Sequence, residues 1–355
     1  PTLRNLLLIC ACLLFAGTHT VSRAQQTPTQ APDEMTRGVE LYKRGENEGA
    51  IKLLRAATKK QKSNAEAWYF LGAALVKQGE VKDAGKSFEA AVKLRPQYAV
   101  AHTGLAYTLL LRNKLPDSQR EAAQALSLNP QDAEAHYVLG VVKLREGKST
   151  EAVKASESAI KAKPELAAPY LLKSQALLRV NAERLLTLIN EKRPLATPPD
   201  EAARKERSSV ETQSYKEAAE SLDTYLKLKP QDDSVNTWRA QLETLRVYAK
   251  SADVPETDRI FDSTAGNSQR ATITGRPEPQ YTERARQAGV EGEVVLSLVL
   301  ASDGTVKHIL VVQSLSHGLT EMAVAAAHKI KFTPATKDGR PVSQYATVIY
   351  NFNLY

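Results

Sequence analysis

Residues 65–96 read AEAWYFLGAALVKQGEVKDAGKSFEAAVKLRP, and this stretch decides the fold of most of the chain. Apolar and small residues recur at helical spacing on both sides of Gly79, which predicts two short amphipathic helices joined by a tight turn. Pro96 ends the second helix because proline lacks the N–H that a helix interior needs. Phe88 supplies bulk between the helices, and Gly72 permits their close approach. A single hairpin leaves an apolar face uncovered, so the sequence predicts further copies.

Copies of this pattern follow with a period of 34 residues. The frame of 65–96 recurs in 99–130 and 133–164, each ending in proline, and an earlier copy fits residues 38–57. The order of Trp, Leu-Gly, Tyr, Ala, Phe, Ala and Pro resembles the tetratricopeptide repeat. That resemblance implies an all-α solenoid with a concave side on which a peptide ligand binds.

The resemblance also implies which side chains face the concave groove. The positions are aromatic and aliphatic, and the Lys and Asn with which some relatives clamp a peptide carboxylate are missing from them. The groove residues are Tyr69, Ala73, Thr103, Tyr107, Tyr137 and Val141. An apolar or extended peptide is therefore the expected ligand. The alternative is that these tyrosines only pack against neighbouring helices.

The solenoid is expected to span residues 34–250, with one interruption. A helical insertion near 181–213 contains three prolines and separates the two halves of a fifth repeat. An amphipathic helix from Val235 then ends the solenoid as a polar terminal cap. Residues 251–274 lack sustained periodicity and are expected to form a linker to a second domain.

The second domain, residues 275–355, changes from helical periodicity to the alternation typical of strands. Asp303-Gly304 predicts a hairpin turn. The motifs EGEVVLSLVLASDGTV, KFTPATKDGRPV and YNFNLY occur in this order, and they resemble the C-terminal domain of the TonB energy-transducer family. The resemblance implies a small α+β domain with a three-stranded antiparallel sheet. The chain is thus expected to be multidomain, an all-α repeat solenoid followed by this domain.

The TonB resemblance also implies a partner and a site. In the family, the last strand pairs with an extended segment of an outer-membrane receptor, and the segment before the first helix touches the same partner. The corresponding residues are Gln280, Tyr281, Ala346, Thr347, Val348, Ile349, Tyr350, Asn351 and Phe352. An edge strand with unpaired backbone groups can accept such a segment. Alternatively, the edge is covered by the linker or by a second copy, which would make a homodimer.

The N-terminal sequence predicts that the protein is localised in the cell envelope. Arg4, an apolar run over 6–17 and small residues near position 24 are typical of a cleaved secretory signal, residues 1–24. A disordered lead-in, 25–33, follows. The run is shorter than the roughly 20 residues that span a bilayer. We therefore expect a periplasmic protein; an uncleaved segment would instead anchor an inner-membrane energy transducer, and Cys12 offers a weak acylation signal.

Other function classes find little support in the sequence. Both cysteines lie in the expected signal segment, and no HExxH, phosphate loop or GxSxG motif is present. We therefore expect no catalytic residues, no metal and no cofactor. Ser316 and His317 could form a catalytic Ser-His pair, but the side chains of adjacent residues rarely face each other. The net charge of +8 is interleaved with acidic residues, so no nucleic acid is expected. The prediction is a binding protein that recognises a receptor or another envelope protein by strand addition.

Overall fold

The computed structural model describes residues 33–190, 201–231, 235–249, 268–287, 289–315 and 317–354. The expected signal segment, most of the expected lead-in and most of the expected linker lie outside these residues. The described residues form two compact units that divide between Leu172 and Lys173. We call them the repeat unit, 33–172, and the C-terminal unit, 173–354, and describe each by itself.

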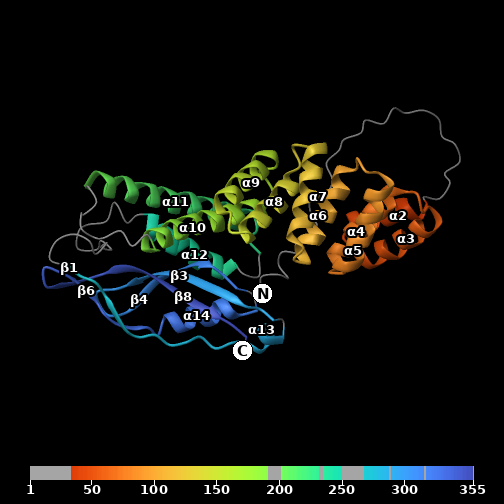
Figure 1. Cartoon of the computed structure of the whole chain (residues 1–355). Helices are drawn as coiled ribbons and strands as arrows, with labels where there is room; N and C mark the ends of the chain where they lie inside the picture. Colours follow the sequence, from red (N-terminus) through yellow and green to blue (C-terminus); the bar gives the residue numbers. More distant parts are fainter. Residues whose placement is uncertain are drawn as a thin grey trace. The chain divides into compact units, whose positions relative to one another are not determined.

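The repeat unit contains four helical hairpins, whose helices lie side by side in chain order (Figure 1). The hairpins are α2 (Glu34–Lys43) with α3 (Asn47–Lys60), α4 (Ala65–Gln78) with α5 (Val81–Leu94), α6 (Ala99–Leu111) with α7 (Leu115–Leu128), and α8 (Ala133–Arg145) with α9 (Ser149–Ala162). Each helix packs on its partner and on the next hairpin, so one apolar core runs through the unit. The predicted all-α repeat architecture is confirmed here.

Successive hairpins approach each other most closely where the Phe88 ring of α5 packs against α6 of the neighbouring hairpin. Its buried ring lies against two glycines, Gly72 of α4 and Gly104 of α6. A Cβ atom at Gly104 would lie 2.5 Å from the ring, nearer than carbon atoms can approach. The small residues of the repeat therefore set the distance between successive hairpins.

An aromatic ring anchors the start of successive repeats. At one repeat position the ring lies close to the carbonyl six residues earlier, in the loop that enters the first helix. The pairs are Trp68 Nε1 with Lys62 O at 3.0 Å, His102 Nε2 with Pro96 O at 2.9 Å, His136 Nε2 with Pro130 O at 3.1 Å, and Tyr170 Oη with Pro164 O at 3.1 Å. A carbonyl only accepts, so each ring donates. The repeat needs a flat side chain with a donor at its edge.

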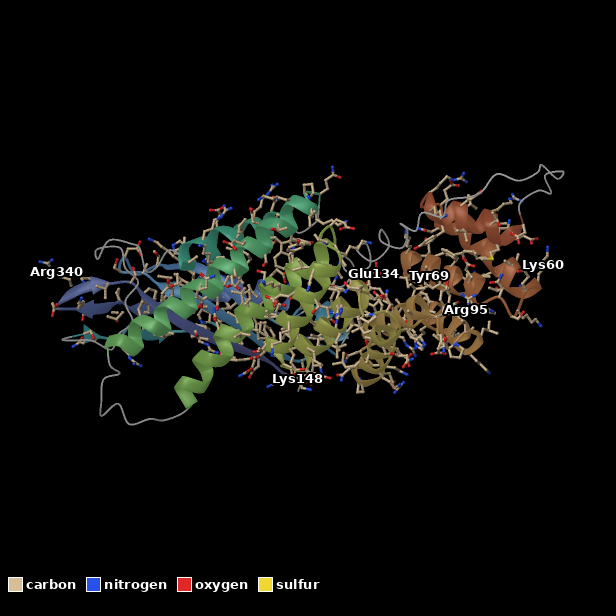
Figure 2. The ribbon with its side chains drawn as sticks, turned by 90° about the horizontal axis from the view of Figure 1, so that it is seen from above. Lys60, Tyr69, Arg95, Glu134, Lys148 and Arg340 are labelled. Carbon is tan, nitrogen blue, oxygen red and sulfur yellow. The ribbon has the colours of Figure 1, made fainter. Side chains whose placement is uncertain are left out.

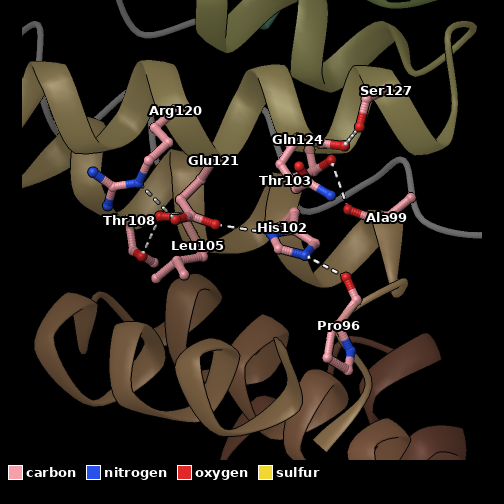
Figure 3. Close-up of polar contacts among 10 residues, drawn as sticks. All are labelled: Pro96, Ala99, His102, Thr103, Leu105, Thr108, Arg120, Glu121, Gln124 and Ser127. Atoms are coloured by element: carbon pink, nitrogen blue, oxygen red, sulfur yellow. Dashed lines mark hydrogen bonds and ion pairs between the residues drawn. The ribbon is translucent and has the colours of Figure 1, made fainter. Parts of the chain in front are cut away.

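The ring of His102 has a second partner, which ties two helices together (Figure 3). Its Nδ1 lies 2.8 Å from Oε2 of Glu121 on α7. The two side chains are only 7% and 15% exposed, and Arg120 contacts the other carboxylate oxygen of Glu121 at 3.5 Å. His102 therefore joins α6, α7 and the preceding loop, which is a structural role.

The ring anchor makes a testable prediction at His136, where the bond is the ring's one hydrogen bond found among the described residues. His136→Phe keeps a flat ring but removes the donor, so we expect a loss of about 0.5–1 kcal/mol in the free energy of unfolding. His136→Tyr should lose less, because Tyr170 makes the same bond in the next repeat. Denaturant unfolding measures both; equal stability of the two variants would contradict the role of the donor.

The C-terminal unit begins within α10 (Ala167–Asn190) and contains helices and three antiparallel sheets. Its other helices are α11 (Glu201–Leu228), α12 (Val235–Ala249), α13 (Glu283–Gln287) and α14 (Leu319–Ala327). The main sheet has the order β4-β3-β8, formed by β3 (Gly292–Leu300), β4 (Val306–Gln313) and β8 (Gln344–Phe352). The predicted three-stranded antiparallel sheet is confirmed.

The two smaller sheets include residues in which no strand was expected. Their orders are β1-β6-β7 and β2-β5. The strands are β1 (Ser268–Gln269), β2 (Thr272–Gly275), β5 (Lys331–Thr333), β6 (Ala335–Lys337) and β7 (Arg340–Val342). Strand β1 and most of β2 fall inside the expected linker. They are too short to show periodicity and form by pairing with distant strands.

Helices cover both faces of the main sheet (Figure 1). Alternate residues of β3, including Val294 and Leu296, pack in a core with α13 and α14. On the opposite face, the Tyr248 hydroxyl of α12 donates to His308 O at 3.1 Å and lies 3.3 Å from Ser297 Oγ. From the sequence, α12 is expected to end the solenoid as a polar cap. Its apolar stripe suits a helix or a sheet equally well, and here it packs on both α11 and β4.

Candidate functional site

The main sheet has two outer strands, and their edges differ. Strand β8 pairs along its whole length with β3, from Gly292 opposite Phe352 to Leu300 opposite Gln344. Within the described residues no strand pairs with the other side of β8. The Ile349 carbonyl accepts a hydrogen bond from Arg276 at 2.7 Å, so it points away from β3. Because backbone groups alternate along a strand, the groups of Thr347 and Asn351 point outward too.

The outer edge of β4 is occupied by a side chain of α12. The Gln241 amide lies with Nε2 3.5 Å from Ile309 O and with Oε1 3.3 Å from the Val311 N–H. These are the two groups that a neighbouring strand would bind. The amide thus replaces a strand at this edge, one of the ways in which proteins protect a sheet edge.

The segment before α13 follows β8 through side-chain contacts. The Ala271 N–H donates to Gln344 Oε1 at 2.8 Å near one end of the strand. The Arg276 guanidinium lies 4.8 Å from the centre of the Tyr350 ring. Near the other end, the Tyr281 ring meets Phe352 edge-on at 5.7 Å. No ladder joins this segment to β8 in the described residues.

The structure brings the residues predicted in the TonB-like domain to this edge. Val348, Tyr350 and Phe352 are buried in the core, whereas Ala346, Thr347 and Ile349 are half-buried. Asn351 and Gln280 are exposed. The Tyr281 hydroxyl donates to Val290 O. Arg276 also lies across the edge but was not predicted, because its segment of the sequence has no recognisable pattern.

The repeat unit has a pocket between the first helices of its hairpins. Its lining combines tyrosine rings with small and aliphatic side chains. The residues are Tyr42, Tyr69, Ala73, Val76, Phe88, Thr103, Gly104, Tyr107, Glu134 and Val138. Of the predicted groove residues, Tyr69, Ala73, Thr103 and Tyr107 line it together, whereas Tyr137 and Val141 do not. Whether these residues bind a peptide stays a prediction.

An acidic side chain in this pocket was not expected. Glu134 stands in the first turn of α8, and Asp132 caps the same helix by accepting from the Glu134 and Ala135 N–H groups. Desolvation, with a further contribution from the Asp132 charge, raises the pKa of Glu134 to about 8, and Lys163 opposes the shift. Burial also raises the pKa of the Tyr69 hydroxyl. Tyr69 and Glu134 are both labelled in Figure 2. In the sequence, Glu134 reads as an ordinary first-turn acid.

Comparison with known proteins assigns both regions. Residues 35–99 and 103–167 match the tetratricopeptide repeat model. Residues 277–354 match the model of the Gram-negative bacterial TonB protein C-terminal region. The protein TonB of Vibrio cholerae is 31% identical over 85 residues, which are 24% of this chain and 35% of that protein. The match therefore spans about a third of that relative's length.

Two solved structures are similar to more than half of the chain. A thermophilic TPR protein of Thermus thermophilus has 17% identity and a TM-score of 0.43, covering 60% of this chain and 97% of that one. The MamA protein of Desulfovibrio magneticus has 20% identity and a TM-score of 0.40, covering 57% and 96%.

The chain thus combines tetratricopeptide repeats with a TonB-type C-terminal domain. Both are binding modules, which supports a protein-binding role in the cell envelope. Among the helices that the structure describes, none is long and apolar enough to span a membrane. In the same residues, no three His, Cys, Asp or Glu side chains converge as metal ligands would.

The pKa of Glu134 makes a prediction about stability. Its folded pKa of about 8 lies above the ordinary value of 4.5, so the folded state holds a proton that the unfolded state loses first. The free energy of unfolding should therefore fall as pH rises from 4.5 to 8 and then level off. Glu134→Gln should remove this loss, gaining on the order of a few kcal/mol at pH 9, since one pKa unit corresponds to about 1.4 kcal/mol.

Urea unfolding of both proteins across this pH range measures the effect, and carbon NMR of the carboxyl group reports its pKa directly. Glu89→Gln, at an exposed position of α5, is the control. A stability difference between wild type and Glu134→Gln that does not change with pH would contradict the prediction.

Proposed function

We propose that this protein is a periplasmic scaffold whose TonB-type domain recognises an extended segment of a partner by adding it as a strand to β8. The partner class is an outer-membrane TonB-dependent receptor or another envelope protein. The repeat unit holds a second protein or peptide in its groove. The TonB family match supports the first part, and the tetratricopeptide match supports the second.

The observation that favours β8 is the difference between the two sheet edges. The Gln241 amide already binds the outward groups of Ile309 and Val311 on β4. At β8, the Arg276 side chain donates to the outward Ile349 carbonyl, and the segment before α13 contacts the side chains of Gln344, Tyr350 and Phe352. An incoming strand needs to displace the exposed Arg276 side chain from the Ile349 carbonyl, whereas access to β4 requires breaking the packing of α12. Strand addition is therefore easier at β8.

The neighbours of β8 supply specificity. Asn351 is an exposed residue of β8, the guanidinium of Arg276 lies beside the edge, and the exposed Gln280 precedes Tyr281, whose ring meets Phe352. Backbone pairing provides affinity for any extended chain, while alternate side chains select among sequences. Arg276 would favour a partner segment that carries an acidic or polar side chain at the facing position.

Proline substitution tests strand addition. Ile349→Pro removes an N–H that points away from β3, so the sheet should keep its own ladder but lose a donor for the partner strand. We expect at least a tenfold loss of partner capture, or about 1.4 kcal/mol. Both cysteines lie at positions 10 and 12, so Asn351→Cys in a chain without these residues can carry a photo-crosslinker that reads out capture from solubilised outer membranes.

Ile349→Ala is the matched control, because it shortens the side chain but keeps the N–H. Retention by Ile349→Ala together with loss by Ile349→Pro would support strand addition. Equal capture by the proline variant would show that the backbone edge is not used. Dimeric wild type and monomeric Ile349→Pro on sedimentation would instead mean that β8 pairs with a second copy.

A further inference from the structure

We propose that the pocket of the repeat unit binds a cationic side chain, a lysine of an extended peptide, with its ammonium group at Glu134. This rests on the scaffold role proposed above and names the ligand class of its groove. The proposed ligand is a peptide with a cationic side chain, whereas the sequence suggested an apolar or extended peptide. The proposal also differs from the binding of a peptide carboxylate by Lys and Asn that some relatives use.

The shape of a lysine matches what the pocket offers. Ala73, Val76 and Val138 provide an apolar wall for the four methylene groups, and Glu134 provides a carboxyl group among them. Lysine side chains commonly bury their stems and keep only the charged head in a polar position. Tyrosine rings also line the pocket, and ring faces attract ammonium groups. The chain itself shows this contact, since Lys77 Nζ lies 4.5 Å from the centre of the Tyr42 ring.

The electrostatics favour a cation over other ligands. Among the described residues, no side-chain hydrogen bond or salt bridge to the Glu134 carboxylate is found, and the charge of Lys163 lowers its pKa by less than desolvation and Asp132 raise it. The second acid, Asp132, accepts a hydrogen bond from Thr103 Oγ1 at 2.7 Å as well as capping α8. The charge of Asp132 disfavours an acidic ligand, and an apolar ligand would leave the half-buried Glu134 carboxyl group without a partner. A bound ammonium group satisfies Glu134 and stabilises its charged form.

Three blocked pentapeptides test the proposal: Ala-Ala-Lys-Ala-Ala and the same sequence with norleucine or glutamate at the centre. They are titrated into the full chain, and the amide shifts of Thr103, Gly104 and Val138 are followed by NMR. We expect the lysine peptide to bind at least about fivefold more tightly than the norleucine peptide, which has the same apolar stem. The glutamate peptide should bind most weakly.

Glu134→Gln should abolish the preference for lysine over norleucine, while Glu89→Gln should leave it intact. A thermal melt of each variant shows that it is folded. Equal or tighter binding of norleucine, an unchanged preference in Glu134→Gln, or no shifts with any peptide would overturn the proposal. The Ile349→Pro variant should bind the lysine peptide normally, so failure here is distinguishable from failure of strand addition at β8.

Discussion

None of the building blocks in this chain can bury its own apolar surface. A two-helix hairpin leaves one face uncovered, so each hairpin of the repeat unit is stable only against the next. The small residues Gly72 and Gly104 allow that contact, because Phe88 enters the space that their missing side chains leave. The same constraint applies to the main sheet, because its three strands cannot cover their own two faces. It is met by α13 and α14 on one side and by α12 on the other.

The two candidate sites would recognise different features of a polypeptide. The edge of β8 presents backbone donors and acceptors, which read an extended conformation more than a sequence. The pocket of the repeat unit presents one carboxyl group among rings and aliphatic side chains, which reads a single side chain. A protein with both can hold two partners through unrelated chemistry. Loss of one interaction then leaves the other intact.

Sequence periodicity predicts most of the helices and strands, but it does not predict contacts between residues that are distant in the sequence. The recurrence of 34 residues predicts the hairpins, because each helix is long enough to show its apolar stripe. The partner of α12 was not predictable, since Leu242, Leu245 and Tyr248 would suit either a helix or a sheet. Glu134 was equally hidden: an acid in the first turn of a helix is usually solvated. Only the packing of three hairpins around it creates a pocket. Arg276 gave no signal because its contact depends on a strand more than 70 residues away.

The amide of Gln241 at the edge of β4 has a consequence for assembly. A sheet with two open edges can be extended at both, and identical chains can then join without limit. Here one edge ends at a side chain of the same unit. Identical chains can then join only through their β8 edges, so a chain with its β8 edge paired has no second edge of the main sheet for a further copy. Self-assembly through β8 would therefore stop at a pair of chains, because neither chain of the pair offers a second open edge of its main sheet.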